Sequence, residues 1–180
     1  TPVVSSAASD VYKRQLAGGA AVTQWPNVEL WSKQVNAAGG LNVGGKKMMV
    51  EIIEYDDKTN PGEHIKAAQR LAEVDKVDFI IAPYGTGFNL AAAPIYAKYN
   101  YPHIGVSAIS DKMPELTARY DNLFFTLGNT TSFTDSVIDI LKDMRDAGTI
   151  GNRVAMVNVA DAFGIELAEA ARPKIKEAGF

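Results

Sequence analysis

Short apolar segments alternate with helix-like segments along most of this sequence. The apolar segments are rich in β-branched residues and lack the polar alternation of a strand with one exposed face. We expect strands at residues 48–55, 77–82, 103–106, 122–127 and 153–159. Because strands separated by helices of about ten or more residues form right-handed β-α-β units, the sequence predicts an α/β fold, with a Rossmann-like parallel sheet flanked by helices.

The helix-like segments carry start and stop signals. Apolar residues at helical spacing span residues 25–38, and the glycine pair 39–40 ends that segment. Asn60, Pro61 and Glu63 combine an N-cap, a first-position proline and a capping-box acid, so we expect a helix to begin there. Its expected apolar positions are Ile65, Ala68, Leu71, Ala72 and Val74. Further helices are expected at residues 89–99, at 133–147 and between 159 and 180.

The composition argues against several classes of function. Charged residues make up 22% of the chain, are interspersed and leave a formal net charge of −3, so no basic surface for nucleic acid is expected. No segment approaches the roughly 20 apolar residues that cross a bilayer. The chain has no cysteine, which excludes disulfides, thiolate metal sites and a cysteine nucleophile. We expect neither a cofactor nor a metal site.

The first residues of the chain correspond to the translation of an artificial DNA sequence. Residues 5–15, SSAASDVYKRQ, are the translation of a widely used transposase-based sequencing adapter. We therefore expect residues 1–15 to be disordered and to lie outside the fold. On this interpretation the natural part begins at Leu16, without its signal peptide and without its first strand.

Two loops after predicted strands are candidates for a ligand site, because ligands of open parallel sheets bind beyond the carboxyl ends of the strands. The first, residues 83–89 (PYGTGFN), places Thr86 between two glycines just before a helix. Backbone N–H groups at a helix start, together with a hydroxyl, suit a carboxylate. The second, residues 107–110 (SAIS), carries two further hydroxyls. At Thr86, helix capping and ligand contact use the same geometry, and both interpretations stay open.

No catalytic residue is predicted. The sequence contains no nucleophile elbow, phosphate loop, zinc-protease motif or dinucleotide fingerprint, since the glycine spacing of the last fails at Leu90. Asp56 and Asp57 favour a turn over a metal site, and His64 and His103 have no third ligand nearby and are interpreted as structural.

Several motifs, taken in order, resemble type I periplasmic binding proteins. They are QW at 24–25, NAAGGL at 36–41, YDD at 55–57, PELT at 114–117 and DAFG at 161–164. The resemblance is to the branched-chain amino acid and amide receptors of ABC uptake transporters. It implies a truncated form of that two-lobed fold, in which residues 16–127 are the first lobe and residues 128–180 the start of the second.

The resemblance also implies the binding residues. The carboxylate-binding hydroxyl falls on Thr86, the second loop contributes a main-chain group and a hydroxyl, and Phe163 stands where relatives often have tyrosine. The implied ligand-binding residues are Trp25, Tyr84, Gly85, Thr86, Ala108, Ser110 and Phe163.

The implied function is that of a receptor and not of an enzyme. It would be periplasmic, or lipid-anchored outside the cytoplasm, and would pass a small amino acid or amide to an ABC permease in the inner membrane. A sensor or regulator that uses the same fold is the alternative interpretation. A nucleotide-dependent α/β enzyme is a further alternative, and its phosphate loop would have to lie at residues 17–20, AGGA.

Overall fold

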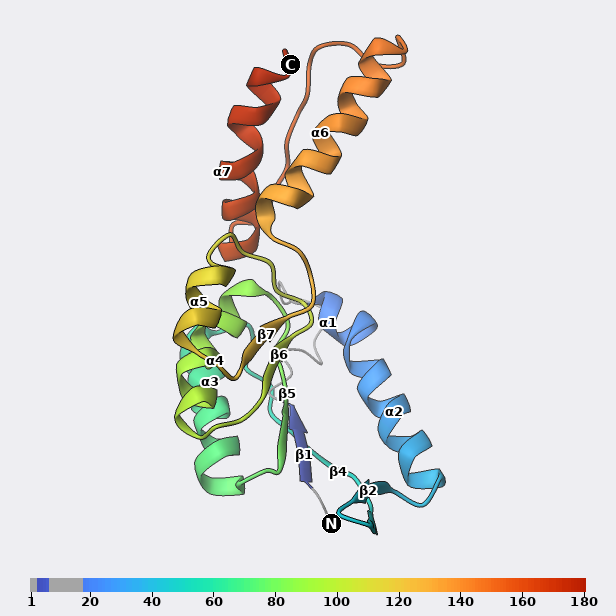
Figure 1. Ribbon diagram of the computed structural model, residues 1–180, viewed down its shortest axis with the longest axis vertical. Coiled ribbons are helices and arrows are strands. Elements are labelled where there is room, and N and C mark those ends of the chain that lie inside the picture. The colour runs from blue at the N-terminus through green and yellow to red at the C-terminus, as the bar shows by residue number, and fades with distance from the viewer. Residues whose placement is uncertain (1–2, 7–17) are drawn as a thin grey trace.

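A three-stranded parallel sheet organises one end of the molecule in the computed structural model (Figure 1), which describes residues 3–6 and 18–180. Its order is β4-β1-β5, with β1 at Val3–Ser6, β4 at Glu51–Glu54 and β5 at Phe79–Ile81. The strands β6, His103–Gly105, and β7, Leu123–Phe125, form a second parallel pair next to β5. The parallel α/β fold predicted from the sequence is therefore confirmed.

The position of β1 corrects the expectation for residues 1–15. Val3–Ser6 pair with β4 on one side and β5 on the other, so they form the central strand of the sheet. The backbone groups of β4 and β5 that face each other need hydrogen-bond partners, and β1 supplies them. The remainder of the predicted adapter segment lies outside the described residues, and its adapter origin stays a prediction.

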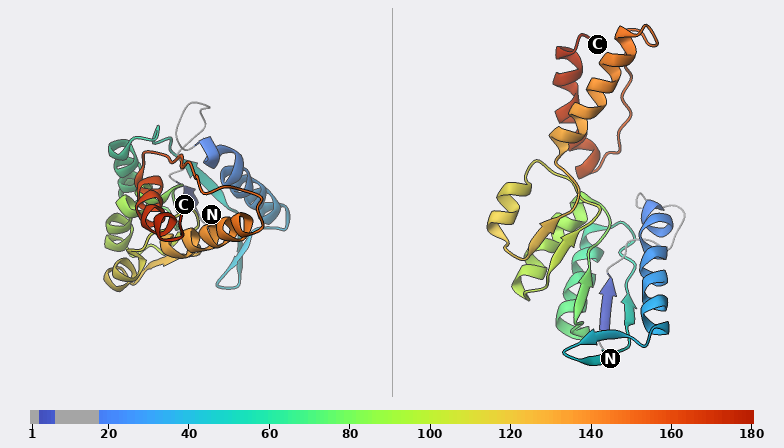
Figure 2. Two further views of the ribbon diagram at one scale, coloured as in Figure 1. Left: turned by 90° about the horizontal axis from the view of Figure 1, so that it is seen from above. Right: turned by 45° about the vertical axis from the view of Figure 1, so that its right-hand side comes forward.

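Helices cover both faces of the sheet and extend beyond it (Figures 1 and 2). Helices α1 (Gly18–Thr23) and α2 (Trp25–Ala37) lie on one side. The other side is covered by α3 (Pro61–Arg70), α4 (Thr86–Lys98) and α5 (Met113–Arg119). The remaining elements are the β2–β3 hairpin (Leu41–Val43, Lys46–Met48), the π-helical segment η1 (Leu71–Asp75), and the packed helices α6 (Thr130–Asp146) and α7 (Ala162–Glu177). No helix among the described residues is long and apolar enough to cross a membrane.

The predicted start of α3 is confirmed. The Oδ1 atom of Asn60 accepts the backbone N–H groups of Gly62 and Glu63 at 2.9 and 3.1 Å, and Pro61 occupies the first helical turn. The carboxylate of Glu63 pairs with Lys66 at 2.8 Å, on the exposed side of the helix. An asparagine cap of this kind stabilises a helix by about 1 kcal/mol.

Two predicted strands differ from the structure. The single strand expected at residues 48–55 is interrupted, because the side chain of Asn36 binds both the N–H and the C=O of Val50, at 2.7 and 2.8 Å. A backbone engaged in this way cannot pair with a neighbouring strand. Residues 153–159 are irregular and exposed, since no described strand lies beside them to complete a ladder.

The core lies between α3, α4 and the sheet. One cluster joins Leu71 to Ala67 and Val77, and a second joins Ala68 to Ala92 and Tyr96. Leu71, Ala68 and Ala72 are buried as expected, but Ile65 and Val74 are exposed. Val74 lies in η1, whose wider turn departs from the 3.6-residue period on which the expectation was based.

Replacement of Leu71 by alanine should lower the free energy of unfolding by about 2 to 5 kcal/mol, because it empties a fully buried position. Val74→Ala, in the same segment, should change it by less than about 0.5 kcal/mol, because that side chain is 68% exposed. Urea unfolding of the intact protein measures both. Equal losses in the two variants would contradict the assignment of the core.

Candidate functional site

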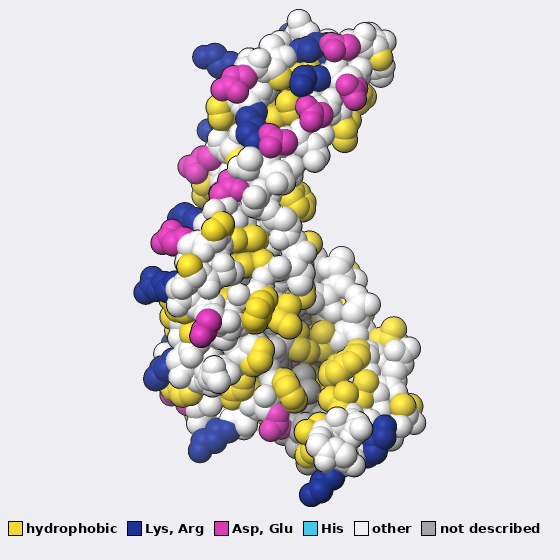
Figure 3. Space-filling model, viewed as in Figure 1, with side chains coloured by type: hydrophobic (Ala, Val, Ile, Leu, Met, Phe, Trp, Pro, Cys, Tyr) yellow, Lys and Arg dark blue, Asp and Glu magenta, His cyan; other side chains and the backbone are white. Residues whose placement is uncertain are grey.

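A cavity of about 730 Å³ lies between α2 and the first turns of α6 and α7. Its walls are mainly apolar and aromatic, and they come from α1, α2, the carboxyl ends of β5, β6 and β7, and the two later helices. The lining residues are Thr23, Gln24, Asn27, Val28, Trp31, Ile81, Tyr84, Val106, Ser107, Ile109, Leu127, Phe133 and Phe163. Hydrophobic side chains gather on this face of the molecule between α2 and the strands (Figure 3). A cavity of this size and character suits a small organic molecule.

A second cavity, of about 360 Å³, lies where three helices begin. It is lined at the start of α3 by Thr59 and Pro61, at the start of α4 by Tyr84, Gly85, Gly87 and Phe88, and at the start of α7 by Asp161 and Ala162. Tyr84 belongs to both cavities, so the two adjoin at its side chain.

The first turn of α4 has no side-chain cap. Helices α3, α6 and α7 are capped by Asn60, Asn129 and Asp161, whereas the N-cap of α4 is Gly85, with a φ of 91° that favours glycine. Its first backbone N–H groups therefore stand uncapped beside the second cavity, at the positive end of the helix dipole. Such an end favours a negatively charged group.

Thr86 is buried and joins two loops. Its hydroxyl donates to the backbone oxygen of Ile109 at 3.0 Å and accepts the N–H of the same residue at 3.2 Å. A hydroxyl has one proton, and this one is already used. Thr86 lines neither cavity, and its side chain does not cap α4. The sequence left helix capping and ligand contact open for Thr86. In the structure its side chain instead fastens the 83–86 turn to residue 109.

Two further side chains hold the same turn. The Nδ2 group of Asn89 donates to the backbone oxygens of Pro83 and Gly85, at 2.7 and 2.8 Å. Ser107 accepts the N–H of Gly85 at 3.2 Å and donates to Pro83 at 3.3 Å. Ser107 and Ile109 also line the larger cavity, so the second predicted loop borders that cavity.

The other predicted site residues are distributed differently from the expectation. Phe163 lines the larger cavity, as expected, but Ala108 and Ser110 are buried and line neither cavity. The hydroxyl of Ser110 donates to the carboxylate of Glu166 at 3.0 Å. Trp25 is half-buried at the start of α2 and is also absent from both linings.

The face of α2 that lines the cavity is the one containing Gln24, Asn27, Val28 and Trp31. These positions are three and four residues apart and therefore lie on one side of a helix, while Trp25 is turned by about 100° from Gln24. Sequence analysis missed this stripe. The helical spacing that defines it was available, but the sequence does not say which face of the helix meets the cavity.

A buried polar cluster lies behind the 83–86 turn. His64 and Asp57 form a fully buried pair through Nδ1 and Oδ2 at 2.9 Å, and the Nε2 atom of His103 lies 2.9 Å from the Oδ1 atom of Asn89. The rings of Tyr96 and His103 meet edge to face, with 5.0 Å between their centroids. Asp57 also accepts the N–H of residue 59 in a tight turn. Within residues 3–6 and 18–180, no group of three His, Cys, Asp or Glu is placed to hold a metal ion.

Comparison with known proteins decides the family. The model of the family described as periplasmic binding protein matches residues 17–180. The chain belongs to the periplasmic binding protein family. The resemblance inferred from the sequence motifs is therefore confirmed.

Three relatives illustrate this membership. An amino acid binding protein of Pseudomonas aeruginosa is 24% identical over 162 residues, covering 86% of this chain and 39% of the relative. The branched-chain amino acid transporter substrate binding protein LivJ of Streptococcus pneumoniae, solved with isoleucine, has a TM-score of 0.74 at 20% identity, over 96% of this chain and 46% of LivJ. An ABC transporter solute binding protein of Rhodopseudomonas palustris BisB5, solved with 3,4-dihydroxybenzoic acid, has a TM-score of 0.69 at 24% identity, over 99% of this chain and 44% of that protein.

These relatives support the type I periplasmic binding protein fold that the sequence predicted. They are solute-binding proteins, not enzymes, which also agrees with the sequence prediction. This periplasmic binding protein chain spans less than half the length of each of the three.

Burial governs the protonation of the polar cluster in this family member. Desolvation lowers the pKa of His103 to about 4, and the electrostatic interaction with nearby His64 contributes to the shift. Burial also raises the pKa of Tyr96, and the carboxylate of Asp57 adds to that effect. His103 is therefore neutral near pH 7. Its Nε2–H group can donate a hydrogen bond to the amide oxygen of Asn89.

The lowered pKa of His103 predicts an acid-sensitive fold. As the pH falls from about 6.5 to about 4, the unfolded chain binds a proton at this residue and the folded chain does not. The free energy of unfolding should fall across this window by on the order of 3 kcal/mol from His103 alone. His103→Gln, which keeps an N–H donor for Asn89 but does not titrate, should lose correspondingly less. Urea unfolding between pH 4 and 7 measures the free energy of unfolding of both proteins. The same dependence on pH in the parent and in His103→Gln would contradict this prediction.

Proposed function

We propose that this chain is part of an extracytoplasmic solute-binding receptor of an ABC uptake transporter, which binds a small amino-acid-like or amide ligand between two lobes. The observation that supports this most is the 730 Å³ cavity, which joins α2 of the first lobe to Phe163 of the second. Membership of the periplasmic binding protein family supports the same function and an extracytoplasmic location.

The lining of the larger cavity favours a ligand with an apolar body. Trp31, Phe133 and Phe163 supply aromatic surface, and no described charged side chain belongs to this lining. The polar end of the ligand then lies toward Tyr84, where the two cavities adjoin and α4 begins. The uncapped N–H groups of that helix are the donors that we assign to a carboxylate.

Thr86 keeps a place in this proposal, with an altered role. Because its proton is given to the backbone oxygen of Ile109, its contribution is to hold the turn before α4, so that the first N–H groups of the helix stand beside the second cavity. The family resemblance implied a direct bond from this hydroxyl to the carboxylate. Both roles make the hydroxyl necessary for binding, and the structure favours the indirect one.

The ligands of the relatives share one chemistry. Isoleucine in the S. pneumoniae protein and 3,4-dihydroxybenzoic acid in the R. palustris protein each carry a carboxylate on an apolar or aromatic body. This common feature supports binding of a carboxylate at the start of α4. The body of the ligand would then contact the walls of the larger cavity. Delivery of the ligand to a membrane permease, with closure of one lobe over the other, completes the proposal. A sensor with the same fold would use the same site.

The carboxylate assignment can be tested with matched solutes. Isoleucine, isoleucinamide and 2-methylbutylamine present one apolar body with a carboxylate, an amide and neither group. Thermal-shift and calorimetric measurements on the intact protein should rank them in that order, and 3,4-dihydroxybenzoate tests an aromatic body in place of the aliphatic one. Equal affinity for all three matched solutes would contradict the assignment.

Thr86→Ala should weaken binding of the preferred carboxylate solute by about 1 to 3 kcal/mol, because it leaves the backbone groups of Ile109 without their partner and frees the turn. Thr86→Ser keeps the hydroxyl and should bind nearly as well as the parent. Calorimetry gives the affinities. Unchanged affinity in the alanine variant would remove Thr86 from the site.

A further inference from the structure

Glu166 accepts three hydrogen bonds at one oxygen, and two of them come from the other predicted lobe. Its Oε1 atom accepts the hydroxyl of Ser110 at 3.0 Å, the backbone N–H of Asp111 at 2.6 Å and the hydroxyl of Thr130 at 3.2 Å. Glu166 belongs to α7, while the donors come from the loop after β6 and from the first turn of α6. We propose that Glu166 is a positioning residue, which holds the second-lobe wall of the ligand cavity against the first lobe when the lobes are closed as they are in this structure. This inference rests on the proposed function for its effect on binding.

The two hydroxyl donors of the anchor are buried, whereas the bond from the N–H of Asp111 is exposed. Ser110 and Thr130 are fully buried, and Glu166 is half-buried. Hydrogen bonds to a charged carboxylate are shorter and stronger than those between neutral groups. Three of them on one oxygen therefore hold α7 in a defined place and orientation relative to the loop after β6.

The anchor acts close to the cavity. Glu166 follows Phe163 by three residues, so the two side chains lie one turn apart on neighbouring parts of the α7 surface. Phe163 lines the larger cavity, and Asp161 and Ala162, just before it, line the second. A displacement of α7 at Glu166 would therefore move the residues that α7 contributes to both cavities.

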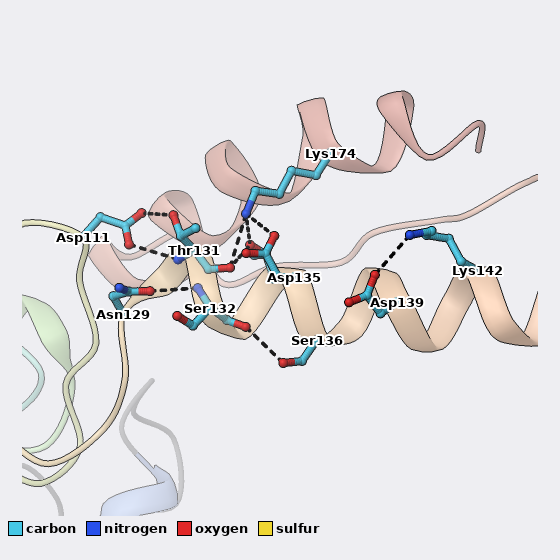
Figure 4. A network of polar contacts seen from close by, with 10 residues as sticks. Asp111, Asn129, Thr131, Ser132, Asp135, Ser136, Asp139, Lys142 and Lys174 are labelled. Carbon is cyan, nitrogen blue, oxygen red and sulfur yellow. Dashed lines mark hydrogen bonds and ion pairs between the residues drawn. The ribbon is translucent and has the colours of Figure 1, made fainter.

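A second set of contacts secures the same junction. The carboxylate of Asp111 accepts the N–H and the hydroxyl of Thr131, at 3.0 and 2.8 Å (Figure 4). From α7, Lys174 donates to the backbone oxygen of Thr131 at 3.3 Å and pairs with Asp135 on α6. The loop after β6 and both second-lobe helices are thus tied together near the first turn of α6, with Glu166 as the link between α7 and the loop.

The anchor also explains the position of Ser110. The sequence resemblance assigned its hydroxyl to the ligand, but here that hydroxyl donates to Glu166, and Ser110 lines neither cavity. Its effect on ligand binding then passes through Glu166. The two residues should behave as one unit when both are replaced.

A double-mutant cycle in the intact protein separates the two roles of Ser110. With isoleucine and 3,4-dihydroxybenzoate as probes, Glu166→Ala and Ser110→Ala should each weaken binding about tenfold, and the double variant should bind no more weakly than Glu166→Ala. Glu166→Gln keeps an oxygen for the three donors and should restore most of the affinity. Glu169→Ala, on an exposed position of the same helix, is the control and should leave binding unchanged. A further loss on adding Ser110→Ala to Glu166→Ala would show that Ser110 acts on binding independently of Glu166, and it would overturn the proposal.

A measurement without ligand tests the anchor itself. Fluorine NMR of 4-fluorophenylalanine at position 163 should show a changed or broadened signal in Glu166→Ala, and near-parental signals in Glu166→Gln and Glu169→Ala. An unchanged signal in Glu166→Ala would overturn the positioning role. If the parent protein binds neither probe, the proposed carboxylate function fails, while the fluorine spectra still decide the role of Glu166.

Discussion

The arrangement of the candidate site depends on the hydrogen bonds of one buried side chain, Asn89. Its amide binds the backbone oxygens of Pro83 and Gly85, and His103 fixes which end of the amide faces them. The chain leaves β5 here and turns sharply into α4. The oxygen of Pro83 has no partner in a strand or helix, whereas the oxygen of Gly85 also accepts the backbone N–H of Asn89 in the first turn of α4. Leaving buried backbone oxygens unpaired would cost about 1 to 3 kcal/mol each. Gly105 makes room for this amide, since a Cβ there would lie 3.2 Å from its oxygen.

Local signals in the sequence were sufficient for much of the fold. The alternation of apolar and helix-like segments predicted the parallel sheet, and the side chain of Asn60 caps α3 as its sequence context indicated. Contacts between distant residues explain the differences. Asn36 interrupts the predicted strand at Val50 from another element, and neighbouring residues alone do not reveal such a contact. The same holds for the π-helical turn that exposes Val74.

The candidate site was predictable in place but not in detail. In the loop after β5, Tyr84 borders both cavities and Gly85 borders the second one. This is the place that the rule for parallel sheets predicted. The hydroxyls of Thr86 and Ser110, however, bind groups of the protein itself. A hydroxyl beside a helix start can bind backbone, side chain or ligand with similar geometry, and the choice depends on what the rest of the chain places within about 3 Å of it. Glu166 is 56 residues away from Ser110, so no local pattern could have indicated their contact.

Under the proposed function, the distribution of charge around the site follows from what a receptor must do repeatedly, which is to bind a solute and to release it. A lysine or arginine beside the carboxylate would be left buried and unpaired each time the solute departs, and an unpaired buried charge is strongly destabilising. Backbone N–H groups at the start of α4 carry only partial charge, so the empty site stays stable. Glu166 carries a full charge, but its three donors belong to the chain and not to the solute. On this argument, full charges near the cavity serve to fix the helices, and partial charges serve to bind the solute.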